Sequence, residues 1–80
     1  KRLEIEHAPH LSPRAKLIKL ADKICNVADT ASNPPASWSR SRRHDYIDFA
    51  EQIAIGCRGN NAALDAEFVR VMERARAQIG

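Results

Sequence analysis

The chain has little of what stabilises most very small proteins. It contains two cysteines, Cys25 and Cys57, which is too few for a disulfide framework. They form no CxxC pair and no Cys/His spacing typical of a zinc site. No apolar run approaches the roughly 18 residues of a membrane span, and no apolar stretch of a secretory signal follows the first residues. Aromatic residues make up only 5% of the 80 residues. The composition therefore indicates either a modest helical domain or a piece of a larger one.

An excess of charge of one sign is also missing. Lysine and arginine total 13 against 10 aspartate and glutamate residues, which gives a net charge of +3. The one dense basic group, Arg40, Arg42 and Arg43, is followed closely by Asp45 and Asp48. A nucleic-acid-binding module would carry a longer basic stripe interleaved with stacking aromatics. We therefore expect neither a nucleic acid nor a membrane as partner, while a site for a phosphorylated small molecule stays open.

Proline and glycine divide the chain into segments. We predict that residues 1–11 are the end of a preceding element followed by a connector. Ser12 and Pro13 are typical of a helix N-cap and first turn, and a helix is predicted from there to about Thr30. Residues 32–36 contain two consecutive prolines and form a loop that no helix can cross.

Two further helices follow this loop. Ser37 or Ser39 caps the second helix, and Trp38 is placed to fold back over its first turn. The segment 59–61 ends that helix and caps the third. Apolar residues recur at helical spacing in all three helices; the predicted stripes comprise Leu17, Leu20, Ala21, Ile24 and Ala28, then Tyr46, Phe49, Ala50, Ile53 and Cys57, then Leu64, Phe68, Val71, Met72, Ala75 and Ile79. The sequence thus predicts an all-α fold.

Two polar side chains stand out against these stripes. At 100° per residue, Asp22 falls on the edge of the first apolar arc, with Asn26 one turn further along the same face. A carboxylate there needs a metal, a cation or hydrogen-bond donors. Arg42 falls at the centre of the second stripe, one turn before Tyr46, so its guanidinium either reaches past the core edge or enters a pocket for an anionic ligand. The residues alone leave both alternatives open.

Other reactive side chains have simpler explanations. His44 and Asp45 are adjacent, but His44 points away from the apolar stripe toward solvent, which argues against a metal site. His7 and His10 lie in the predicted connector. Both cysteines occupy apolar positions and are interpreted as small core residues. No phosphate loop, GxGxxG turn, HExxH motif or GxSxG elbow is present.

The segment KLADKICN, residues 19–26, is similar to the KLADKxxN stretch of the RelA/SpoT-type HD-domain hydrolases. The nearest resemblance is to the stand-alone small alarmone hydrolase branch, which hydrolyses ppGpp. Residues 38–46 resemble that family's W-S-x-x-R-x-x-x-Y helix, and residues 56–61 resemble its G-x-x-G-x-N turn. The motifs occur in the family's order, and the resemblance covers about residues 1 to 72.

The resemblance implies an all-α bundle with a metal, typically Mn²⁺, held by a histidine, a His-Asp pair and a final aspartate. Asp22 matches that final aspartate. Asn26, Arg42 and Tyr46 match residues that line the substrate pocket. The family's other metal ligands and its acidic catalytic pair precede the segment that this chain matches. The resemblance therefore implies that residues 1–80 are the C-terminal part of one HD-type domain.

The implied reaction is hydrolysis of ppGpp, or pppGpp, to release pyrophosphate, which for ppGpp leaves GDP. The implied partners are the nucleotide, the N-terminal part of the same domain and, as an open possibility, further copies in a homo-oligomer. Three alternatives remain: an inactive helical fragment, a helical interaction module, and an HD-type hydrolase of another nucleotide such as NADPH. Unpaired cysteines favour a cytoplasmic location.

Overall fold

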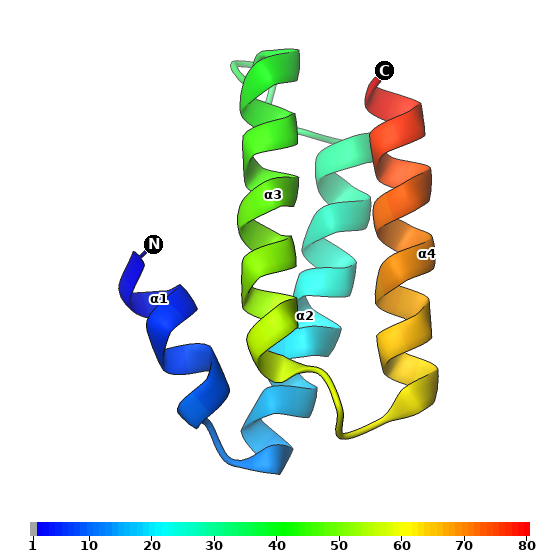
Figure 1. The fold of residues 1–80 in the computed structure, drawn as a ribbon. Coiled ribbons are helices and arrows are strands. Elements are labelled where there is room, and N and C mark those ends of the chain that lie inside the picture. Colours follow the sequence, from blue (N-terminus) through cyan, green and yellow to red (C-terminus); the bar gives the residue numbers. More distant parts are fainter. Residues whose placement is uncertain (1) are drawn as a thin grey trace.

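A computed structural model describes residues 2–80 as a bundle of helices (Figure 1). No strand occurs within this range, so the predicted all-α class is confirmed. The elements in chain order are α1 (Arg2–His7), the short 3-10 helix η1 (Ala8–His10), α2 (Pro13–Ser32), α3 (Arg40–Cys57) and α4 (Ala62–Ile79). The segment predicted as the end of a preceding element followed by a connector contains the helix α1 and the turn η1, and only residues 11 and 12 link it to α2.

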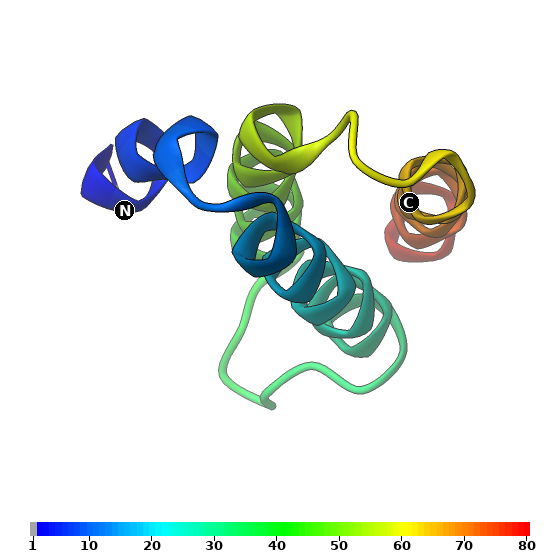
Figure 2. The same cartoon turned by 90° about the horizontal axis from the view of Figure 1, so that it is seen from below.

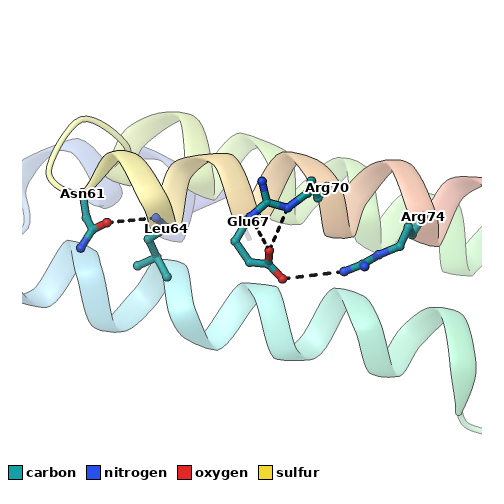
Figure 3. Close-up of polar contacts among 5 residues, drawn as sticks. All are labelled: Asn61, Leu64, Glu67, Arg70 and Arg74. Carbon is teal, nitrogen blue, oxygen red and sulfur yellow. Dashed lines mark hydrogen bonds and ion pairs between the residues drawn. The ribbon is translucent and has the colours of Figure 1, made fainter.

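The starts of the three long helices follow from local capping. The Ser12 hydroxyl accepts a hydrogen bond from the Ala15 N–H, and the Ser39 hydroxyl accepts one from the Arg42 N–H. Asn61 caps α4 in the same way, through the Leu64 N–H (Figure 3). Each cap satisfies a backbone donor that has no partner inside the helix. The predicted starts are confirmed, and of the two serines proposed for α3, Ser39 is the cap.

Helix α2 forms the middle of the bundle, because it packs against both α3 and α4 (Figures 1 and 2). The short helix α1 lies beside α3 and away from α4. On α4, the half-buried Glu67 pairs with Arg70 and Arg74, as Figure 3 shows. No helix in the described range is long and apolar enough to cross a membrane.

The core confirms most predicted apolar positions on α3 and α4, but α2 differs. Ala21 and Ala28 are exposed, whereas Val27 and Ala31 are buried. The buried arc of α2 is shifted because α3 and α4 both flank this helix. The side chains of α2 that face the space between α3 and α4 are the ones that become buried. The buried residues form one cluster: Ala8, Leu20, Val27, Ala31, Ile47, Ala50, Ile53, Ala54, Cys57, Phe68, Val71, Met72, Ala75 and Ile79.

The two cysteines have different environments. Cys57 lies fully within the core, as predicted, and burial raises the pKa of its thiol against smaller opposing effects of Lys16 and Lys19. Cys25 is exposed, so its assignment to the core was wrong. It lies on the side of α2 that no described helix covers.

One close approach joins the N-terminal segment to α3. Gly56, near the end of α3, faces Ala8 and Pro9 of η1 so closely that a β-carbon built on it would lie 2.8 Å from the Ala8 Cβ. The same β-carbon would lie 2.9 Å from the Pro9 Cδ. Glycine is therefore needed here for contact rather than for backbone conformation. The contact holds η1, and with it α1, against α3.

A side chain of α3 ties down the end of α2. The Arg43 guanidinium donates to the Thr30 carbonyl through Nε at 3.1 Å and to the Ala31 carbonyl through Nη2 at 2.6 Å. The last carbonyls of a helix have no partners within it and carry its partial negative charge. Arg43 thereby fixes both ends of the loop between α2 and α3.

Candidate functional site

The loop between α2 and α3 and the two helices border an open pocket, the polar pocket, whose lining residues are mostly polar. Its volume is about 240 Å³. Two of the predicted site residues, Asn26 from α2 and Tyr46 from α3, line it together. The other lining residues are Asp29, Thr30, Asn33, Pro35 and Trp38. Asn26 and Tyr46, twenty positions apart in the sequence, thus line the same pocket. They meet there because α2 packs on α3 and because Arg43 holds the loop that joins these two helices.

Asp22 adjoins this pocket through Asn26. The Asn26 Nδ2 donates to the Asp22 Oδ2 at 3.2 Å, one helical turn apart. Asp22 itself is exposed, so its expected place at the rim of a buried stripe was wrong. The reason is that nothing in residues 2–80 packs on this side of α2. Its neighbours there include Ile18, which is 63% exposed, and Cys25.

Arg42 is also exposed and does not lie at the centre of the α3 stripe. It belongs to the first turn of α3, which Trp38 from the loop covers as predicted. The Arg42 guanidinium carbon lies 4.6 Å from the centre of the Trp38 ring, a cation–π distance. The Trp38 and Tyr46 rings are 6.0 Å apart. Arg42 therefore sits at the outer edge of the pocket, held by a side chain that lines it.

Sequence reasoning missed Lys23, which lies behind Tyr46. Lys23 is 7% exposed, and its Nζ donates to the Tyr46 hydroxyl oxygen over a long 3.5 Å. The same Nζ lies 4.0 Å from a carboxylate oxygen of Glu4 in α1. A signal was present: Lys23 shares the helical phase of Leu20 and Val27, the two fully buried residues of α2.

A complete metal site is not formed by these residues alone. No three histidine, cysteine, aspartate or glutamate side chains come together in the described part of the chain. His44, expected in solvent, is half-buried, and its Nε2 lies 3.2 Å from the Gly80 carbonyl oxygen at the end of α4. His7 and His10 are exposed on α1 and η1. Asp22 remains the one metal ligand that the sequence predicted.

A larger hollow of about 430 Å³ lies between α3 and α4. Its floor includes Leu20, and its walls include Phe68, Val69 and Met72. None of the predicted site residues lines it. The smaller pocket is therefore the candidate functional site, because Asn26 and Tyr46 both line it.

Comparison with known proteins gives relatives of one kind. No protein-family model matches the chain, and no solved structure matches it. A curated protein of Xenopus tropicalis, named guanosine-3′,5′-bis(diphosphate) 3′-pyrophosphohydrolase MESH1, is 45% identical over 67 residues, or 84% of this chain. The proteins of the same name from Danio rerio and Homo sapiens are 47% and 46% identical over 64 and 65 residues. The chain is homologous to these MESH1 proteins.

The matches confirm the resemblance to ppGpp hydrolases inferred from the motifs. They cover 37% of the length of the Xenopus tropicalis MESH1 and 36% of the Danio rerio and Homo sapiens proteins. The chain thus spans well under half of the curated relatives that it matches. The roles predicted for Asp22, Asn26, Arg42 and Tyr46 stay predictions, now attached to a defined pocket.

Proposed function

We propose that residues 1–80 form the C-terminal part of a metal-dependent ppGpp 3′-pyrophosphohydrolase domain, which converts ppGpp to GDP and pyrophosphate. The observation that carries the proposal is the polar pocket shared by Asn26 and Tyr46, with Asp22 bonded to Asn26 beside it. Homology to MESH1 proteins named for this reaction supports the choice of substrate. The substrate is ppGpp or its pentaphosphate counterpart.

Asp22 suits the role of a metal ligand by its chemistry. An exposed carboxylate offers the hard oxygen that Mn²⁺ and similar divalent cations prefer. The Asn26 amide, donating to one carboxylate oxygen, orients Asp22 as outer hydrogen-bond partners orient metal ligands. A divalent metal, when bound, supplies Lewis-acid activation of water and of the phosphate. The remaining metal ligands and the acidic catalytic pair belong to the rest of the domain.

The pocket residues bind and orient the nucleotide. Asn26 and Tyr46 offer hydrogen-bonding groups to the nucleoside, while Arg42, next to the pocket-lining Trp38, offers a guanidinium to the phosphates. The Trp38 ring keeps that guanidinium in position by stacking beneath it. Together these groups position the diphosphate relative to Asp22.

The rest of the domain packs on the open side of α2. Ile18 and Cys25 are exposed there next to Asp22. An apolar surface beside a predicted metal ligand is where the helices that carry the other ligands need to lie. The coverage of less than half of each MESH1 relative supports the existence of such helices. Two free thiols, Cys25 and Cys57, support a cytoplasmic location.

The test is ppGpp hydrolysis by the full-length protein that contains this chain, with manganese added. Asp22→Ala should lower kcat/KM by at least about a hundredfold, because a metal ligand stabilises transition-state charge. Asp45→Ala is the control: it removes another exposed aspartate, one that lies on α3 outside the pocket. Equal activity of the Asp22→Ala and wild-type proteins would refute the assignment of Asp22. Absence of hydrolysis by the wild-type protein would refute the proposed function.

A further inference from the structure

Lys23 is the one lysine buried in the described chain, and its surroundings compensate its charge poorly. Its side chain is 9% exposed, against 34% for Lys19 one turn earlier. The nearest carboxylate oxygen, on Glu4, is 4.0 Å away. Its other neighbours are the Tyr46 hydroxyl at 3.5 Å and the rings of Tyr46 and Phe49 at 5.7 and 5.4 Å. Keeping an ammonium group in such a place costs stability.

The chemistry of the two groups fixes the direction of their contact. A lysine ammonium has three N–H donors and no acceptor, so the Tyr46 oxygen has to accept. The single hydroxyl proton of Tyr46 then points away from Lys23, because the positive charge repels the positive end of the O–H dipole. Tyr46 lines the polar pocket and Lys23 does not, so Lys23 contacts the hydroxyl from outside the pocket and leaves the hydroxyl proton free to point into it.

We infer that Lys23 is a positioning residue that sets the Tyr46 hydroxyl as a hydrogen-bond donor into the pocket. The pocket consequently selects, at Tyr46, an acceptor oxygen of the ligand, such as a phosphate or sugar oxygen. Without Lys23, the hydroxyl rotates freely between donating and accepting. The inference rests on the proposed function only for the identity of the ligand, since the direction of the hydroxyl follows from the contacts themselves.

Lys19 provides a matched control. It lies on the same helix one turn earlier, and its Nζ is also 4.0 Å from the same Glu4 oxygen. Lys19→Met and Lys23→Met therefore each remove one ion pair to this oxygen and one unit of charge. They differ in the contacts with the Tyr46 hydroxyl and with the rings of Tyr46 and Phe49, which Lys23 makes. Lys23→Arg is the conservative variant, because it retains the charge and N–H donors.

The first measurement is the kinetics of ppGpp hydrolysis by the full-length protein. Lys23→Met should raise KM about fivefold, the equivalent of about one hydrogen bond, with little change in kcat. Lys23→Arg should recover most of that loss, and Lys19→Met should leave KM near the wild-type value. In a Tyr46→Phe background, Lys23→Met should have almost no further effect, because no hydroxyl remains to orient. Equal effects of Lys19→Met and Lys23→Met, or fully additive effects with Tyr46→Phe, would overturn the inference.

The second measurement is independent of hydrolysis and of the substrate. Tyr46 is the only tyrosine of residues 1–80, and in tyrosine-labelled full-length protein its ring signals are those that Tyr46→Phe removes from the NMR spectrum. In the full-length protein, Lys23→Met should shift these signals clearly more than Lys19→Met does. Equal shifts would overturn the inference even if hydrolysis is observed. A clear difference would support it even if the wild-type full-length protein does not hydrolyse ppGpp, in which case the proposed function alone fails.

Discussion

Replacement of Gly56 by alanine sets two effects of opposite sign against each other. Gly56 lies within α3, and alanine in a helix is favoured over glycine by about 1 kcal/mol or less. The new β-carbon, however, would lie 2.8 Å from the Ala8 Cβ, 2.9 Å from the Pro9 Cδ and 3.0 Å from the Pro9 nitrogen. These atoms belong to a proline ring, a backbone and a short side chain, none of which moves easily aside. Overpacking of this kind costs about 1–3 kcal/mol.

The balance favours destabilisation. We expect Gly56→Ala to lower the free energy of unfolding by about 1 kcal/mol, which in a domain of this size lowers Tm by roughly 5 °C. Strain at this point separates η1 from α3, so α1 and its Glu4 carboxylate should also move away from Lys19 and Lys23. Urea unfolding followed by circular dichroism measures the first effect, and the fluorescence of the single tryptophan, Trp38, gives a second probe of the same transition.

A double-mutant cycle isolates the contact. Ala8→Gly removes the methyl group nearest to the new β-carbon, so its own cost should be smaller in the Gly56→Ala background than in the wild type. A coupling of about 1 kcal/mol is expected for residues in direct contact. An increase in stability on Gly56→Ala, equal to the helix preference for alanine, would refute the close approach of η1 to α3.

Two further predictions concern stability. Arg43→Ala should lower the free energy of unfolding by about 1.5 kcal/mol in urea titrations, because the Thr30 and Ala31 carbonyls at the end of α2 lose charged donors; an unchanged midpoint would contradict this. Because burial raises the pKa of the Cys57 thiol, the folded state keeps the thiol proton at pH values somewhat above 9.0, the usual pKa of this group. The unfolded state releases the proton at these pH values. Stability should therefore fall as pH rises past 9.0, and Cys57→Ala, but not Cys25→Ala, should reduce that fall.

The capping pattern allowed the helix starts to be predicted because capping is a local interaction. Ser12, Ser39 and Asn61 each bond to a backbone N–H three residues later, so neighbours in sequence suffice to determine them. The apolar stripe of α4 was predicted for a related reason. Helix α4 packs mainly against α2, and helical periodicity identifies a single face well.

The orientation of α2 could not be predicted in the same way. Periodicity gives the angles between side chains on one helix, but two flanking helices decide which of those angles are covered. Ala21 and Cys25 therefore appeared buried from the sequence and are exposed in the structure. Lys23 is the reverse case, since the sequence analysis did not identify it as buried and it is buried in the structure.

For the candidate site, the sequence by itself determined which residue types occur and in which order. Its motifs identified Asp22, Asn26, Arg42 and Tyr46 and a kinship with ppGpp hydrolases, which the MESH1 relatives confirm. The tertiary structure decided that Asn26 and Tyr46 share one pocket and that Lys23 lies behind it. The physical reason is that motifs record residues along one chain, whereas a pocket depends on how helices distant in sequence pack together.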